Sequence, residues 1–509
     1  MRTMNAHCEV VTKTDDGVDR ITFGELAKRV DRLAHALTKL GVKPGDRIAT
    51  FSWNTQHHLE LYLAVPCLGA VLHTLNIRLF PEQLTYVANH AEDRFLFVDP
   101  SLLDLLEPVE STFTTIEKRF VMGDDEYEAL LADAPDTPFD WPEIDDRSAA
   151  GLCYTSGTTG NPKGVLYSHR SNLLHVMGKC LADAEGVRYG DRVLPVVPMF
   201  HANAWGFPYA CALMGADLVF PSRFVNAEVI AGLIESEKVT IAGGVPTVWL
   251  DLLAYADEHK PDFSSLRMLV CGGSAVPESL MRAYTERHGV SIVQAWGMTE
   301  TSPLASVSHA PTEDYATRAR QGRPIALIEA RIVGDDGNEL PWDGETTGEL
   351  EVRGPWIASE YYEDPAGEEK FHDGWLRTGD IASIDATGSI RLSDRSKDVI
   401  KSGGEWISSV DLENAIMSHP AVAEAAVIGM PHERWSERPL ACVVCEDGQS
   451  VEADELKTYL VDHVAKWWLP DEIVFIDEVP KTSVGKFDKK VLRAQLAEGA
   501  LLPERAATG

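Results

Sequence analysis

The sequence lacks the long apolar runs of membrane-spanning helices, and its first residues do not have the pattern expected of a secretory leader. In its 509 residues, no run approaches the roughly 18 consecutive apolar residues that a spanning helix needs. Residues 1–7 lack the apolar core of a signal peptide. Positive charge is also scarce, because 46 lysines and arginines face 79 aspartates and glutamates, which gives a net charge of −33. We therefore expect a cytoplasmic protein whose partner is neither a nucleic acid nor an anionic membrane.

The sequence also lacks a paired cysteine framework, an internal repeat and a low-complexity tract. Its eight cysteines are scattered. Cys442 and Cys445 form a C-x-x-C, but they lie in the apolar stretch 440–445 with no second pair and no flanking histidine. This context predicts a buried strand rather than zinc or redox chemistry, and it indicates a reducing compartment.

The N-terminal half alternates between helical and strand patterns. Thr22 and Glu25 form a capping box for a helix predicted over 20–41, which ends at Gly41. The alternation predicts a doubly wound, largely parallel α/β architecture. Further helices are expected near 55–68 and after Pro81. Strands are expected at 46–51, 71–76, 95–99, 149–154, 192–196, 217–220, 268–271 and 291–294. The acidic, proline-containing residues 104–148 suggest an irregular link.

The pattern changes twice in the second half. From about 322 to 395, short strands separated by Gly/Asp/Pro turns predict an antiparallel β-rich subdomain. The remainder predicts a small α+β domain, with helices near 408–418 and 453–467, strands near 423–429 and 440–445, and a terminal helix from about 487. At 509 residues two or three domains are expected, and we place them at 1–395 and 396–509.

Residues 154–165, Tyr-Thr-Ser-Gly-Thr-Thr-Gly-Asn-Pro-Lys-Gly-Val, combine three glycines, several hydroxyl residues and Lys163. Glycines let backbone N–H groups face an anion, and the lysine adds positive charge. A helix start is expected after it, from Leu166 through 168–173. The Walker loop G-x-x-x-x-G-K-[ST] does not fit, because Pro162 takes the place of its second glycine and Gly164 follows the lysine. A phosphate loop of another architecture is therefore expected.

This loop and six later motifs resemble those of the adenylate-forming superfamily, which comprises acyl-CoA synthetases, luciferases and peptide-synthetase adenylation domains. The later motifs are 197–209, 271–277, 294–300, 375–380, 394–405 and 480–487. They follow the family's order, and the resemblance covers about residues 20–495. It implies a large N-terminal adenylation domain, a small mobile C-terminal domain, and ATP, coenzyme A and Mg²⁺ as ligands.

The resemblance implies a nucleotide site formed from several segments. Its ATP- and AMP-binding residues would be Thr155, Ser156, Gly157, Thr158, Thr159, Gly160, Lys163, Gly273, Ser274, Ala275, Ala295, Trp296, Gly297, Met298, Thr299, Asp380 and Arg395. Trp296 stands where the family usually has tyrosine, and it would still stack on adenine. Asp380 and Arg395 would bind the ribose. Thr155 and Glu300 would hold Mg²⁺, which prefers oxygen ligands.

The resemblance also implies the catalytic and substrate residues. Lys486, His201, Thr299 and Glu300 would be catalytic, and Lys486 would neutralise charge between the attacking carboxylate and the α-phosphate. His201, Trp205, Gly206 and Gly297 would line the acyl pocket, with Trp205 as its gate. Lys397 would be the hinge, and Lys401, Gly403, Gly404 and Glu405 would line the coenzyme A channel.

Within the family, residues 197–209 are most similar to fatty acyl-CoA synthetases and to ligases for short sulfur-containing acids. We therefore predict an AMP-forming ligase for medium- or long-chain fatty acids. The resemblance also suggests a homodimer. A ligase for methylthiopropionate or another short-chain acid is the alternative. A carrier-protein adenylation domain, a luciferase-type oxygenase and a nucleotide-binding regulator without catalysis are more remote. Retention of Glu300, Asp380, Arg395 and Lys486 together argues against the regulator.

Overall fold

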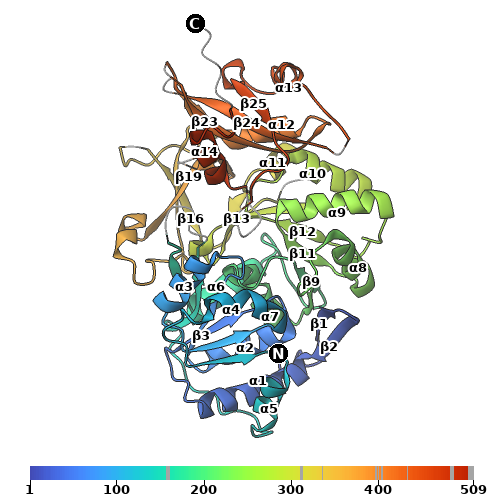
Figure 1. The fold of residues 1–509 in the computed structure, drawn as a ribbon, viewed down its shortest axis with the longest axis vertical. Helices are drawn as coiled ribbons and strands as arrows, with labels where there is room; N and C mark the ends of the chain where they lie inside the picture. Colours follow the sequence, from blue (N-terminus) through green and yellow to red (C-terminus); the bar gives the residue numbers. More distant parts are fainter. Residues whose placement is uncertain are drawn as a thin grey trace.

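The computed structural model describes residues 1–155, 161–309, 313–334, 336–395, 398, 400–402, 405–432, 434–446, 448–481 and 487–502. It contains four β-sheets and confirms the predicted α/β class, with a large N-terminal part and a smaller C-terminal α+β part. Figure 1 shows the C-terminal elements at one end of the long axis and α1, α2 and α5 at the other. Among the described residues, no helix is both long and apolar enough to span a bilayer.

The first sheet has six strands in the order β6-β5-β3-β4-β7-β8. Its neighbours are parallel except for the antiparallel hairpin β7–β8. The central strands are buried almost throughout, as expected when helices cover both faces of a parallel sheet. The strands are β3 (Arg47–Phe51), β4 (Val71–Thr74), β5 (Phe95–Val98), β6 (Lys118–Val121), β7 (Ala149–Tyr154) and β8 (Gly164–Ser168).

Six helices accompany this sheet. The first, α1 (Phe23–Lys39), carries the predicted capping box: Thr22 Oγ1 accepts from the Glu25 N–H, and the Glu25 carboxylate accepts from the Thr22 N–H. Its apolar stripe, including Leu26, Val30 and Leu33, is buried in the core. The others are α2 (Gln56–Cys67), α3 (Pro81–His90), α4 (Leu103–Glu110), α5 (Asp125–Ala132) and α6 (His169–Lys179).

The second sheet has nine strands in the order β15-β14-β13-β12-β11-β9-β10-β1-β2. Its strands are β1 (Glu9–Thr14), β2 (Gly17–Thr22), β9 (Arg192–Pro195), β10 (Asp217–Phe220), β11 (Ile241–Gly244), β12 (Met268–Cys271), β13 (Ile292–Gly297), β14 (Leu304–Val307) and β15 (Arg323–Pro324). Its helices are α7 (Phe207–Met214), α8 (Ala227–Glu237), α9 (Pro246–His259), α10 (Glu278–Ala283) and α11 (Tyr315–Arg318).

Two five-stranded sheets complete the fold. The predicted β-rich region is antiparallel, with β16 (Glu329–Val333), β17 (Gly348–Arg353), β18 (Phe371–His372), β19 (Trp375–Ile384) and β20 (Ile390–Arg395). The C-terminal sheet contains β21 (Ile400–Ser402), β22 (Glu405–Ile407), β23 (Val422–His432), β24 (Ser436–Cys445) and β25 (Glu472–Phe475), and its helices are α12 (Ser409–Met417), α13 (Ala453–Leu460) and α14 (Lys489–Ala497). Cys442 and Cys445 lie in β24, so the C-x-x-C belongs to a strand as predicted.

The prediction of an irregular link was wrong for residues 104–132, which contain most of α4, the edge strand β6 and α5. Residues 133–148 contain no helix or strand, as predicted. The acidic cluster that suggested a link caps α5, because Asp124 Oδ1 accepts from the Tyr127 N–H and acidic residues fill the first turn. In β6 only Phe120 is buried, which leaves too weak a pattern to recognise.

Three boundaries also differ from the prediction. Helix α1 begins at Phe23 rather than at residue 20, because Gly17–Thr22 pairs with β1 as β2. Leu166 lies in β8 opposite Leu152, and the next helix begins only at His169. The helix predicted over 453–467 ends at Leu460, whose carbonyl accepts from the N–H groups of residues 463 and 464 and closes a turn.

Candidate active site

Trp296 and Asp380 meet where β13 of the nine-stranded sheet approaches β19 of the β-rich sheet. Trp296 Nε1 donates to Asp380 Oδ2 over 3.0 Å, and the two residues are only 8% and 4% exposed. The Asp380 N–H in turn donates to Thr378 Oγ1 over 3.1 Å. The candidate adenine and ribose residues, 84 positions apart, are therefore in direct contact.

Glu300 follows β13 in the short turn Thr299–Thr301 and is fixed on both its side chain and its backbone. Tyr361 OH donates to Glu300 Oε1 over 2.6 Å, and the Glu300 carbonyl accepts from the Ala358 N–H over 2.8 Å. The Thr299 carbonyl accepts from Tyr167 OH over 2.7 Å. Burial and the Glu300 carboxylate both raise the pKa of Tyr361, which therefore remains a donor. One carboxylate oxygen, Oε2, is left for another ligand.

Gly297, assigned to both the nucleotide and acyl pockets, leads into this turn. A Cβ built on it would lie 1.7 Å from the Pro303 carbonyl oxygen, so only glycine fits. The Met298 N–H donates to the same carbonyl over 3.1 Å. The close backbone approach thus sets the path of the chain between Trp296 and Glu300.

Thr155 and Lys163 face each other across the neck of the β7–β8 hairpin. The Thr155 N–H donates to the Lys163 carbonyl over 2.9 Å, and the Lys163 N–H donates to Thr155 Oγ1 over 3.1 Å. Lys163 Nζ lies 3.2 Å from Asp364 Oδ2 and 4.7 Å from the centre of the Tyr361 ring. Tyr361 therefore contacts both the loop lysine and Glu300.

The loop that follows β12 contributes the candidate adenine-side residues. Gly273 has a φ of +88°, and both it and Ser274 are exposed. Beyond Ala275, the Val276 N–H donates to Gln294 Oε1 over 3.1 Å. This bond ties the loop to β13, the strand that carries Ala295 and Trp296.

The candidate acyl residues lie on an unusual left-handed turn. After His201, residues 202–206 all have positive φ, with values from 44° to 78°. Figure 1 places α7, which starts directly after this turn, near the junction between the two large sheets. A Cβ on Gly272, at the end of β12, would lie 3.3 Å from Trp205 Cη2 and 2.8 Å from the Ala295 carbonyl. The indole of Trp205 thus reaches the same strand ends as the nucleotide residues.

Other predicted site residues lie outside the described residues: Ser156, Gly157, Thr158, Thr159, Gly160, Lys397, Gly403, Gly404 and Lys486. Arg395 ends β20, Lys401 lies in β21 and Glu405 begins β22, and only their backbone is described. Their predicted roles stay predictions.

The donor set at the site fits Mg²⁺. The described part of the chain contains no group of three or more His, Cys, Asp or Glu residues placed to hold a metal. Mg²⁺ does not need one, since it is usually held by one or two carboxylates together with substrate phosphates and water. Glu300 Oε2 and the Thr155 hydroxyl supply oxygen donors of that kind.

Sequence reasoning missed Tyr361, Asp364 and Tyr167, which surround Glu300 and Lys163. Tyr361 and Asp364 follow β17 by several residues in an irregular segment, where periodicity gives no signal. Tyr167 alternates with exposed Leu166 in β8 and has the pattern of an ordinary core residue.

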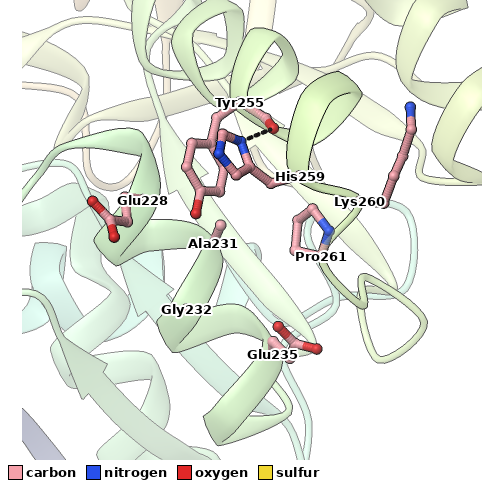
Figure 2. A pocket seen from close by; sticks show the side chains of 8 residues that line it. All are labelled: Glu228, Ala231, Gly232, Glu235, Tyr255, His259, Lys260 and Pro261. Atoms are coloured by element: carbon pink, nitrogen blue, oxygen red, sulfur yellow. Dashed lines mark hydrogen bonds between the residues drawn. The ribbon is translucent and has the colours of Figure 1, made fainter.

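A separate surface depression of about 430 Å³ lies between α8 and α9. Figure 2 shows its lining, in which the stacked rings of Tyr255 and His259 face Glu228 and Ala231. None of the predicted site residues lines it. The candidate active site is therefore the junction of strand ends described above, in keeping with ligand binding at the carboxyl ends of parallel strands.

Comparison with known proteins gives two family matches. The model described as AMP-binding enzyme matches residues 2–362, and the one described as AMP-binding enzyme C-terminal domain matches residues 411–486. A 3-methylmercaptopropionyl-CoA ligase of Ruegeria pomeroyi is 46% identical, with 95% of this chain and 93% of the relative covered. A long-chain-fatty-acid–CoA ligase of Thermus thermophilus is also 46% identical, with 96% and 92% covered. A medium-chain-fatty-acid–CoA ligase of Ectopseudomonas oleovorans is 42% identical, with 96% and 93% covered.

Solved structures agree with these matches. The anthranilate CoA ligase AuaEII in complex with anthranoyl-AMP superposes with a TM-score of 0.89 at 27% identity, covering 97% of this chain and 95% of that one. ATP-bound MatB from Rhodopseudomonas palustris superposes with a TM-score of 0.87 at 26% identity, covering 98% and 97%.

Proposed function

The chain belongs to the AMP-binding enzyme family, and on this premise we propose that it is an AMP-forming acid–CoA ligase for medium- or long-chain fatty acids. The supporting observation is one continuous set of contacts at the strand ends. It runs from Thr155 and Lys163 through Tyr361 to Glu300, and β13 then leads to Trp296 and Asp380. These contacts bring together residues from several separate stretches of the chain to which the proposal assigns the nucleotide.

The proposed reaction has two steps. A carboxylate oxygen of the acid attacks the α-phosphorus of ATP, the bond to the β-phosphate oxygen breaks, and pyrophosphate leaves. The thiolate of coenzyme A then attacks the acyl carbon of the acyl-adenylate, and AMP leaves. Both steps need positioning and charge stabilisation more than a nucleophilic side chain, and Lys163 provides positive charge in a strongly acidic protein.

The roles of individual residues form part of the proposal. Asp380 binds ribose while Trp296 orients it, and Thr155 and Glu300 would hold Mg²⁺. The bound ion would neutralise phosphate charge. Lys486 belongs to the first step, and Lys397 is the hinge by which domain 396–509 turns against domain 1–395 between the steps. A homodimer and a cytoplasmic location complete the proposal.

The acid itself has two candidates. The fatty-acid ligases support a medium or long chain. The Ruegeria enzyme supports the alternative, a short sulfur-containing acid, 3-methylmercaptopropionate. Trp205 bears on the choice, since an indole at the pocket entrance must move aside for a long chain and can stay in place over a short one.

A coenzyme A-dependent assay across straight-chain acids from acetate to palmitate, with 3-methylmercaptopropionate included, tests the proposal. We expect acid-dependent pyrophosphate and AMP release with a maximum at octanoate or longer. A maximum at 3-methylmercaptopropionate would establish the alternative. Nucleotide binding without pyrophosphate release for any acid would exclude a ligase and favour a regulator.

A second assay separates the two steps. Lys486→Ala should lose adenylate formation and still convert supplied acyl-adenylate and coenzyme A into thioester. An equal loss of both half-reactions in a folded variant would contradict the assignment of Lys486 to the first step.

A further inference from the structure

Two residues of the segment Tyr361–Asp364 contact the charged groups of Glu300 and Lys163. Tyr361 OH bonds Glu300 Oε1, and Lys163 Nζ stands over the Tyr361 ring while pairing with Asp364 Oδ2. The Tyr362 N–H donates to the Gly164 carbonyl over 2.8 Å. This backbone bond anchors the segment to β8, directly beside Lys163.

The two carboxylates differ in their surroundings. Glu300 is 5% exposed and held by a phenol, whereas the Asp364 side chain is 25% exposed and pairs with a lysine that is itself 36% exposed. An ion pair this accessible contributes little net stability. The Lys163 ammonium can therefore exchange Asp364 for another anion at small cost.

We propose that Asp364 competes with the nucleotide's phosphates for Lys163, and that Tyr361 holds the Glu300 carboxylate in position while this exchange takes place. The proposal rests on the proposed function, because it assigns the exchanging anion to the polyphosphate of ATP. Asp364 and Tyr361 are positioning residues in this account, since each acts through Lys163 or Glu300.

The exchange has a consequence for binding. A polyphosphate that reaches Lys163 must displace one carboxylate and then lie beside it, so Asp364 weakens the retention of ATP and of pyrophosphate. Weaker retention of pyrophosphate favours its departure after the first step. Removing the competing carboxylate should tighten polyphosphate binding and slow that departure.

Equilibrium binding of Mg·ATP in the absence of any acid tests the competition without turnover. Asp364→Asn should lower the Kd for ATP about fivefold, the factor that corresponds to the upper range of an exposed ion pair. Glu363→Gln is the matched control, because Glu363 is an exposed neighbour of the same charge, and it should change the Kd by less than about twofold. An unchanged or higher Kd in Asp364→Asn would overturn the proposal.

A double-mutant cycle tests whether Asp364→Asn tightens ATP binding through Lys163 or only by removing a negative charge near the phosphates. In the Lys163→Met background, Asp364→Asn should tighten ATP binding by less than about twofold. An undiminished effect would show that Asp364 acts on the phosphates without Lys163, which contradicts the exchange. Asp364→Glu should restore the parent Kd to within about twofold, and failure of this rescue also counts against it.

The role of Tyr361 has its own test. Tyr361→Phe removes only the hydroxyl that bonds Glu300, and Tyr362→Phe is the control one residue away. In the presence of ATP, paramagnetic resonance should show Mn²⁺ binding weakened about tenfold in Tyr361→Phe, as expected when a charged group loses a hydrogen bond. The control should stay within about twofold. Equal metal affinity in a folded Tyr361→Phe variant would remove Tyr361 from the proposal.

Failure of the proposed function can be distinguished from failure of the inference about Asp364 and Tyr361. If the parent protein binds no ATP at all, the proposed function is wrong and the exchange falls with it. If the parent binds ATP and forms acyl-adenylate but the variants match it, only the inference about Asp364 and Tyr361 is wrong.

Discussion

The Trp296 indole N–H donates to Asp380 Oδ2 over 3.0 Å, within a site where both residues are almost fully buried. The resemblance suggested that a tryptophan in this position preserves ring stacking. The structure shows a further contact, because the indole N–H donates to one carboxylate oxygen and fixes the direction of the other. The residue predicted to stack on adenine thereby also holds the carboxylate predicted to bind ribose.

This contact predicts a binding defect in Trp296→Phe. The phenyl ring keeps an aromatic face but loses the donor to a charged acceptor, which is worth about 1.5–3 kcal/mol. We expect KM for ATP to rise about tenfold or more, with kcat changed less than about threefold. Steady-state kinetics with varied ATP measure the split. A fall in kcat alone would mean that Trp296 acts on the chemistry instead of on nucleotide binding.

Gly206 predicts a different defect at the acyl side. Its φ is +78°, and an added Cβ would lie 2.9 Å from His175 Cε1, while the His175 ring is held by the Leu304 N–H at 3.2 Å. Gly206→Ala should therefore lower the free energy of unfolding by about 1–3 kcal/mol and raise KM for the acid.

Gly232 offers the matched control for this change. It lies within α8, and an added Cβ would meet nothing within 4 Å. Gly232→Ala should leave kinetics unchanged and stabilise the protein by up to about 1 kcal/mol. Urea denaturation compares the two variants. Equal stability of both would contradict the steric argument at Gly206.

The sequence was sufficient for features that depend on local pattern. The capping box at Thr22, the buried strands of the parallel sheets and the antiparallel region after 322 all follow from periodicity and turn residues. The α/β class and the family could be predicted because several motifs occur in a fixed order. The hairpin β1–β2 was missed because its partner, β10, lies about 200 residues away in sequence.

The site was predictable only residue by residue. Trp296, Glu300 and Asp380 sit within recognisable motifs, so they could be proposed as site residues from the sequence. Their mutual contacts could not, because Asp380 and Tyr361 approach β13 from a different sheet and an irregular segment. The ion pair between Lys163 and Asp364 joins residues about 200 positions apart, and neither position alone indicates it.

Lys179 and Glu185 form a fully buried ion pair beneath α7, with the ammonium 3.5 Å from the centre of the Phe207 ring. Lys179→Met leaves the Glu185 carboxylate buried without its partner and should cost about 3–5 kcal/mol of unfolding free energy. The double variant Lys179→Met with Glu185→Leu should recover most of that loss. Lys238→Met, in a pair whose side chains are 60% and 42% exposed, should cost less than about 1 kcal/mol. Denaturant titration measures all three, and equal losses in the single and double variants would contradict the account.

Two buried histidines predict a loss of stability on mild acidification. Burial lowers the pKa of His58 to about 4 and that of His175 to about 3, so both stay neutral in the folded protein near neutral pH. The unfolded chain takes up protons at these positions below its ordinary pKa of about 6.5. Each histidine therefore contributes stability that is complete above pH 6.5 and is lost as pH falls toward the folded pKa, at about 1.4 kcal/mol per pH unit.

Other buried groups also make the free energy of unfolding depend on pH. The raised pKa values of Asp93 and Glu185 stabilise the folded protein as pH falls, which is opposite to the effect of the histidines. The difference between the parent and a His58→Gln variant therefore isolates the contribution of His58. Between pH 7 and pH 5 the free energy of unfolding of the parent should fall by about 2 kcal/mol more than that of His58→Gln. This comparison does not depend on any difference in stability between the two proteins at pH 7. Urea denaturation at pH 7, 6 and 5 gives the curves of the parent and the variant. Parallel curves for parent and His58→Gln would mean that His58 is not held neutral by burial, because an unperturbed group contributes no pH dependence to folding.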